Sequence, residues 1–208
     1  MTMDKINKIN DVLILMLKIA YLNLIWLGIT ILGLGIFSVG PASYALMKYY
    51  DQTLRLKNEL PVLRTFWQYF KERYRQSVLI SWIYLAVCAV FIVNIFFNRV
   101  WSLQIINVLM LILVLFSFTH VYTLMAATKY EKISELLKGA ALLGFGYLHY
   151  SIITWTILGV SYFLAARFAP ALLFLFGFSF AGFLFAMAGR KILKEFLPIE
   201  NENKPREI

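Results

Sequence analysis

The sequence is poor in charged residues and in cysteine. Of its 208 residues, 15% are charged and 61% are hydrophobic, against about 25% and about 45–50% in soluble domains. So little polar surface cannot cover so much apolar side chain in water. This composition argues against a soluble enzyme, a disordered protein and a nucleic-acid-binding domain. The single cysteine, Cys88, cannot form an internal disulfide and indicates no redox compartment.

Catalytic motifs are also absent from the sequence. It has no Walker A, GxSxG, HExxH, CxxC or GxGxxG pattern. None of its 11 acidic residues lies in a long uncharged run. This argues against a proton or cation relay, a paired-carboxylate hydrolase and most metal sites. We therefore expect neither an enzyme nor a cofactor or metal site.

The sequence does contain five long uncharged stretches. They cover residues 19–47, 76–98, 100–128, 139–166 and 168–189. About 20 apolar residues cross a bilayer as a helix, and backbone polar groups in hydrocarbon must be bonded internally. Barrel strands would alternate polar and apolar residues, which these stretches do not. We predict an all-α polytopic membrane helix bundle over residues 19–189. Its five spans are expected at about 19–39, 77–97, 105–127, 146–166 and 168–188.

Basic residues are distributed unevenly between the connections. With five crossings, the first loop (48–76), the third loop and the C-terminal tail (190–208) share one side and hold 15 of the 20 Lys and Arg residues. Positive charge is retained in the cytoplasm, so this side is predicted to be cytoplasmic. The N-terminal tail (1–18) then lies outside although it carries three lysines. In the alternative, residues 41–57 dip into the membrane and place that tail inside.

The first loop includes an amphipathic segment, residues 61–76. On a helix, its aromatic and aliphatic residues fill one arc and most of its basic residues the opposite one. A basic, aromatic-rich helix joined to a span is expected at the membrane interface, where its cations attract anionic lipid headgroups. The predicted surface for lipid or for a cytoplasmic partner comprises Arg64, Phe66, Trp67, Phe70, Lys71 and Arg75. Nucleic acid is not an expected partner, since membrane orientation accounts for the net charge of +9.

Polar residues inside the predicted spans are candidates for function, because burying them in hydrocarbon is costly. The predicted intramembrane cluster comprises His120, His149, Asn23 and Asn94. The two histidines lie at nearly equal depth in consecutive spans. They either pack through hydrogen bonds, with Tyr122, Tyr147 or Ser151 as partners, or line a path for a proton or a polar ligand. A pair without a third ligand is a weak metal site.

Small residues recur in the last span. Gly182 and Ala186 are four positions apart, a spacing that lets two helices approach closely. The alternatives are packing inside the bundle and a seam between two copies in a homo-oligomer.

The N-terminal third carries a recognisable pattern. An N-L-x-W element (23–26) is followed by G-P-A (40–42), T-F-W-x-Y-F-K (65–71) and R-Q-S (75–77). This resembles the YesL-like family of small bacterial membrane proteins, a domain family without an assigned function. The resemblance is densest over residues 20–80. It implies a protein of the Gram-positive plasma membrane, of a kind often encoded beside carbohydrate ABC transporters and their sensors. It supplies no catalytic residue and no ligand.

Two functions follow as expectations. The first is an accessory or regulatory component associated with bacterial carbohydrate uptake, with ABC transporter or sensor components as partners. The alternative is a small-solute transporter or channel, working through a cavity lined by the intramembrane cluster.

Overall fold

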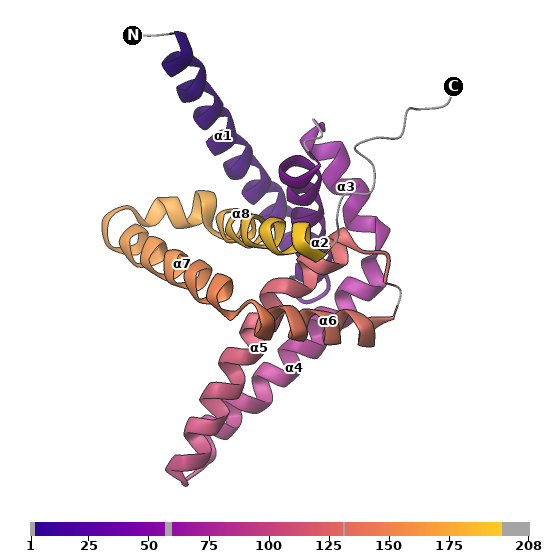
Figure 1. Cartoon of the computed structure of the whole chain (residues 1–208), viewed down its shortest axis with the longest axis vertical. Coiled ribbons are helices and arrows are strands. Elements are labelled where there is room, and N and C mark those ends of the chain that lie inside the picture. The colour runs from indigo at the N-terminus through magenta and orange to yellow at the C-terminus, as the bar shows by residue number, and fades with distance from the viewer. Residues whose placement is uncertain (1–2, 57–59, 131, 197–208) are drawn as a thin grey trace.

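The computed structural model describes residues 3–56, 60–130 and 132–196, and these are almost entirely helical (Figure 1). The elements are α1 (Met3–Leu32), α2 (Val39–Tyr50), the π-helix η1 (Asp51–Arg55), α3 (Val62–Glu72), α4 (Tyr74–Phe97), α5 (Trp101–Ala127), α6 (Ile133–Gly146), α7 (Leu148–Phe168) and α8 (Pro170–Phe196). The described residues contain no strand, so the predicted all-α class is confirmed.

Five of the described helices are long and apolar enough to cross a membrane. The candidate spans are Ile9–Leu32, Tyr74–Phe97, Trp101–Ala127, Leu148–Phe168 and Pro170–Leu193. Their outward side chains are largely apolar, with Phe97 82% and Phe168 79% exposed. Such surfaces are stable in hydrocarbon and not in water. The fold is that of a polytopic helical membrane protein.

The first span differs from its predicted bounds of 19–39. α1 is already helical at Met3, within the segment predicted as a tail, and it ends at Leu32. A turn over residues 33–38 follows, in which Leu34 and Gly35 have φ angles of 57° and 68°. An L-residue in this left-handed region cannot continue an α-helix, so the uncharged run is divided between two helices.

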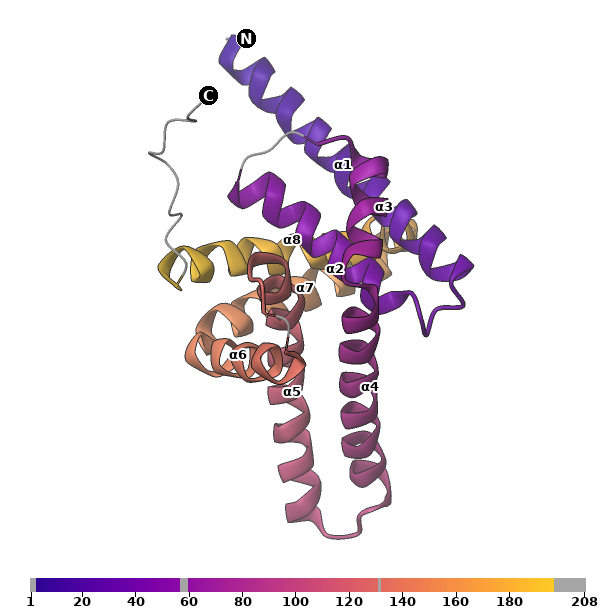
Figure 2. The same ribbon diagram turned by 90° about the vertical axis from the view of Figure 1, so that its right-hand side faces the viewer.

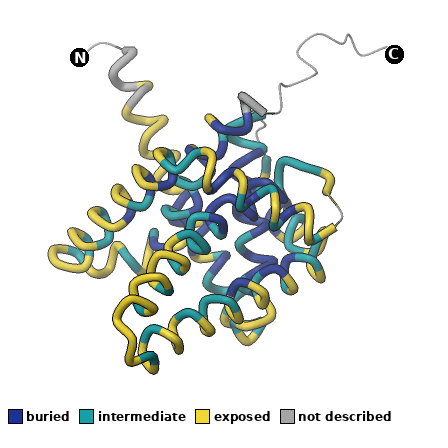
Figure 3. The backbone as a smooth tube through the Cα atoms, turned by 60° about the horizontal axis from the view of Figure 1, so that its bottom comes forward, coloured by how far each residue is buried: buried dark blue, intermediate teal, exposed yellow. Residues whose placement is uncertain are grey.

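α2 lies where the other helices meet. Nine of its twelve residues are buried, and it contacts α1, α3, α4, α5 and α8. Gly40 allows α4 to approach, because a Cβ there would lie 2.4 Å from the Ser77 carbonyl oxygen. Figure 3 shows the buried residues gathered at this crossing, with the outer parts of the long helices exposed.

The second half of α1 and the continuous α2–η1 segment form an antiparallel helical hairpin. Next to the turn, the Ser38 hydroxyl donates to the Thr30 carbonyl at 3.0 Å. Farther along, Trp26 Nε1 donates to Ser43 Oγ at 3.4 Å. At the open end, Lys18 and Thr53 line the same hollow. The chain therefore returns, after η1, to the end of the hairpin where α1 enters it.

α4 and α5 form a second, longer hairpin that projects away from α2 (Figure 2). The buried residues of α4 are confined to positions 77–84, and those of α5 to positions 117–125. The outer halves of both helices are thus left to lipid. The third hairpin, α7–α8, projects in another direction from the same centre (Figure 1).

α6 is an element that the sequence analysis did not predict, because it precedes the fourth predicted span and covers residues assigned to the third loop and to the start of the uncharged stretch 139–166. It packs against α5, with Leu136, Ala140 and Leu143 buried. Gly144 lets the two backbones approach, since a Cβ there would lie 3.2 Å from the Ser117 nitrogen. α7 then begins at Leu148, two residues after the predicted start of that span.

Candidate functional site

α3 is attached to the protein by one face and exposes the other. Phe66 is fully buried in the core, beside the buried Thr65. Lys48 of α2 holds the end of the helix, with its Nζ 2.5 Å from Glu72 Oε2 and 4.8 Å from the centre of the Tyr69 ring. The prediction that Phe66 belongs to the exposed interfacial surface is therefore wrong. Its side of the helix packs on α2 instead of facing lipid.

The outer face of α3 carries exposed cations and one exposed indole. Trp67 is 48% exposed and stacks on the half-buried Phe70, with ring centres 5.4 Å apart. Lys71 Nζ lies 5.0 Å from the centre of the Trp67 ring, within range of a cation–π interaction. The predicted surface residues that stay exposed are Arg64, Trp67 and Lys71 of α3 and Arg75 in the first turn of α4. We call these four residues the outer α3 surface.

A hollow lies at each end of this surface. The hollow near the start of α3 has a volume of about 730 Å³ and is lined by Tyr21, Pro61, Val62, Leu63, Arg64 and Trp67. The other, near the end of α3, has a volume of about 490 Å³ and is lined by Lys71, Glu72, Arg73, Tyr74, Arg75 and Gln76. The first is mostly apolar with one cation, and the second is mostly charged.

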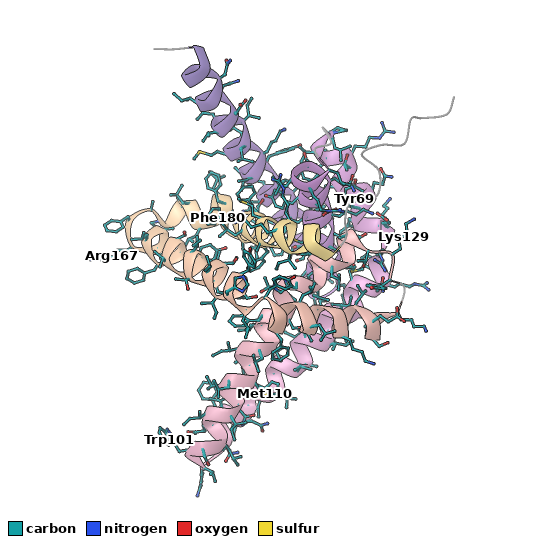
Figure 4. All side chains as sticks on the ribbon, viewed as in Figure 1. Tyr69, Trp101, Met110, Lys129, Arg167 and Phe180 are labelled. Carbon is teal, nitrogen blue, oxygen red and sulfur yellow. The ribbon has the colours of Figure 1, made fainter. Side chains whose placement is uncertain are left out.

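Arg73 connects α3 and α4 to the end of α5. Its guanidinium donates to the carbonyls of Met125 at 2.9 Å and Thr128 at 3.3 Å, and also to that of Tyr130. The last carbonyls of a helix lack intrahelical partners, and a cation there is favoured by the helix dipole. The guanidinium of Arg73 is therefore occupied by hydrogen bonds within the protein. In Figure 4, Tyr69 of α3 and Lys129 after α5 lie on the same side of the molecule.

η1 contains an ion pair between the buried Asp51 and the partly buried Arg55. Arg55 Nε lies 2.6 Å from Asp51 Oδ1, and Nη2 lies 2.8 Å from Oδ2. The side chains are only 11% and 5% exposed. Hydrogen bonding to the Asp51 carboxylate raises the pKa of Arg55 above its ordinary value, against the opposite effect of burial. Sequence reasoning missed this pair, although its i,i+4 spacing between two apolar segments was a usable signal.

Hydrogen bonds from three neighbouring helices converge on the first half of α8. Asn23 Nδ2 donates to the Phe174 carbonyl at 2.8 Å, and Asn23 Oδ1 accepts from the Ser179 N–H at 3.0 Å. The Tyr50 hydroxyl lies 2.6 Å from Ser179 Oγ. Tyr162 donates to the Gly177 carbonyl at 2.5 Å. We call Asn23, Tyr50, Tyr162 and Ser179 the α8 junction. Its polar groups are engaged with one another and with backbone.

The predicted intramembrane cluster is not brought together. His120 is 1% exposed, and its Nε2 lies 2.9 Å from Ser151 Oγ, the hydrogen-bonded alternative from the sequence. His149 is exposed, with its ring 4.2 Å from that of Tyr150. Asn94 is exposed on the outer half of α4, and Asn23 belongs to the α8 junction.

The predicted cluster does not line the hollows between the helices. A cavity of about 100 Å³ lies between α1, α2, α5 and α8, and a hollow of about 540 Å³ lies between α1, α7 and α8; none of the four predicted residues lines either of them. Sites for small molecules usually measure about 300–1,000 Å³. Within the described residues, no group of three His, Cys, Asp or Glu side chains could hold a metal ion. These findings remove the structural support for a transport path through the cluster.

The small residues of α8 serve packing inside the molecule. Both Gly182 and Ala186 are buried. A Cβ on Gly182 would lie 2.8 Å from Leu46 Cδ2 of α2, and one on Gly189 would lie 2.3 Å from Thr123 Cγ2 of α5. This stripe is occupied by α2 and α5, and it is not free to form a seam between two copies.

The architecture defines a class, the polytopic helical membrane proteins, and comparison with known sequences narrows it. A family model described as "Protein of unknown function, DUF624" matches residues 19–95. The uncharacterized protein YteU of Bacillus subtilis (strain 168) is 30% identical over 172 residues, which are 78% of this chain and 75% of that protein. The chain belongs to the DUF624 family. The matched segment includes residues 20–80, where the resemblance noted from the sequence is densest. No solved structure matches the chain significantly.

Proposed function

We propose that the protein is an accessory or regulatory membrane subunit of a bacterial carbohydrate-uptake system, acting by binding and not by catalysis. The observation that carries the binding role is the outer α3 surface, whose cations stay exposed on α3, which is fixed by Phe66 and the Lys48–Glu72 pair, and at the start of α4. The polar groups of the α8 junction, by contrast, are engaged inside the protein. The link to carbohydrate uptake rests on the resemblance over residues 20–80.

The proposed partner surface is the charged hollow at the end of α3. Lys71 and Arg75 are exposed there, on a segment fastened to α5 through Arg73. A cationic patch on a rigid support suits an acidic surface of a transporter or sensor subunit, because charge complementarity directs encounter and orientation.

The orientation that we propose places this surface in the cytoplasm of a plasma membrane. The antiparallel pairing of α1 with α2–η1 supports a hairpin that enters and leaves on one side, so the N-terminal segment shares the side of the first loop. Of the 20 Lys and Arg residues, 18 then lie inside, and only Arg99 and Arg167 lie outside. This revises the five-crossing topology in favour of the alternative with a dipping segment.

Cysteine labelling in cells with permeable walls tests this orientation. In a Cys88→Ser background, a membrane-impermeant maleimide should label Ser102→Cys, at the tip of the α4–α5 hairpin. It should label Asn7→Cys only after the membrane is opened. Labelling of Asn7→Cys in intact cells would refute the proposed side of the N-terminal segment.

Affinity capture tests the binding role. The tagged protein, isolated in mild detergent after crosslinking, should carry a subunit of a carbohydrate transporter or its sensor, identified by mass spectrometry. The variant K71E/R75E should lose that partner. K129E/K138E, with the same charge change at exposed positions outside α3, should keep it. Clean preparations, or equal loss from both variants, would refute the proposed surface.

A further inference from the structure

The apolar hollow at the start of α3 combines one cation with two amphipathic rings. It lies between α1 and α3 and has a volume of about 730 Å³. Arg64 is its cation, and Trp67 and Tyr21 are 48% and 44% exposed. Of the described residues that line it, none is acidic. The acidic end of α3, Glu72, is paired with Lys48.

One wall of the hollow belongs to a helix that meets lipid. Tyr21 lies within the candidate span Ile9–Leu32. Leu24 and Ile31, at helical spacing from Tyr21, share its side of α1, lie farther from the N-terminal segment, and are 46% and 73% exposed. An apolar stripe therefore runs along α1 past the cationic end of the hollow.

We propose that this hollow binds an anionic phospholipid, with the lipid phosphate on Arg64 and the acyl chains along Leu24 and Ile31. A guanidinium matches phosphate oxygens with two parallel hydrogen bonds. Indole and phenol rings prefer the headgroup level, where one edge is apolar and the other is hydrated. An acidic peptide would use the cation but not the apolar stripe, and a second copy of the chain would bring a basic protein to a basic surface.

The test measures lipid binding to the purified full-length protein in neutral detergent, by native mass spectrometry and thermal stabilisation. Phosphatidylglycerol and phosphatidylcholine of equal chain length are compared. Wild type should bind phosphatidylglycerol more tightly, and R64Q should weaken this binding about fivefold, the effect of one cation near an anionic headgroup. R64K should lose less, because it keeps the charge but not the bidentate geometry.

R99Q is the matched control. It removes the same charge from an exposed arginine between α4 and α5 that lines neither hollow, so this variant's preference for phosphatidylglycerol should equal that of wild type. An R64Q effect no larger than that of R99Q would overturn the proposal. Two other results would do so: glycerol 1-phosphate alone binding as well as the lipid, or an acidic peptide displacing phosphatidylglycerol at lower concentration.

A salt titration of the wild-type protein covers the case in which R64Q does not purify. Binding of phosphatidylglycerol should weaken between about 50 and about 500 mM salt, because exposed charges are screened. Binding that is independent of salt would overturn the proposal. The partner-binding variant K71E/R75E does not alter the residues lining this hollow, so failure of either proposal is seen separately.

Discussion

Replacing Asn23 with leucine tests whether side chains from neighbouring helices hold α8 in place. The side chain is fully buried and bonds two backbone groups of α8, the Phe174 carbonyl and the Ser179 N–H. Leucine has a similar size and is favoured in lipid, so hydrophobicity and packing change little. The substitution therefore isolates the loss of two interhelical hydrogen bonds.

The expected destabilisation of Asn23→Leu is about 1–3 kcal/mol. A net hydrogen bond contributes about 0.5–1.5 kcal/mol in soluble proteins and about 0.6 kcal/mol on average between helices in a membrane protein. Two such bonds give the stated range. For a chain of this length, each 1 kcal/mol lowers the unfolding temperature by about 2–4 °C, so a drop of about 2–12 °C is expected.

Thermal unfolding in detergent, followed by size-exclusion recovery, is a suitable assay. Asn94→Leu is the matched control, since Asn94 is exposed on α4, and its effect should stay within about 0.5 kcal/mol. Tyr50→Phe adds a coupling test, because Tyr50 also bonds Ser179 and residues in one network are non-additive. Equal unfolding temperatures for the two leucine variants would refute the role assigned to the α8 junction.

Three further outcomes are expected. Gly40→Ala should destabilise the protein by about 1–3 kcal/mol, because its Cβ would lie 2.4 Å from a backbone carbonyl of α4. The control Gly28→Ala meets nothing within 4 Å and should gain about 0.5–1 kcal/mol in helix propensity. Thermal unfolding that ranks the two variants the other way would contradict the packing of α2. Asp51→Asn leaves the partly buried Arg55 without its carboxylate and should cost about 1–3 kcal/mol, which the double variant D51N/R55Q should partly restore; a double variant no more stable than the single one would argue against the pair. Burial, with the charges of Glu72 and Asp51 adding to it, raises the pKa of Tyr69 above its ordinary value of 10.0, so the neutral phenol is favoured in the folded state. The contribution of Tyr69 to the free energy of unfolding should therefore be fully present below pH 10 and be lost as the pH rises through the raised pKa. Unfolding curves at about pH 9 and about pH 11 should show a smaller loss of stability for Tyr69→Phe than for wild type.

The fold class and four of the five spans could be read from the chain because their causes are local. The transfer of residues 100–128 into lipid is favourable whichever helices pack beside them. The helical period of apolar residues over 62–72 can likewise be seen in the sequence without knowing what the helix contacts. The first span was misplaced because residues 19–47 carry no charge to mark the turn at Leu34 and Gly35. An uncharged run reports that a segment is apolar, and it does not report how many helices share it.

The candidate site depended on contacts between distant parts of the chain. Asn23 and Ser179 are 156 positions apart, and no period or spacing connects them, so the sequence could mark Asn23 as costly in lipid without naming its partner. The same limit applied to Phe66, whose apolar face has identical periodicity whether it meets lipid or α2. The amino-acid sequence by itself determined that the chain belongs in a membrane and where its cations gather, because both follow from local composition. Only the tertiary structure decided which polar groups satisfy one another and which face of α3 stays open, because hydrogen bonds and burial require atoms from separate helices to meet.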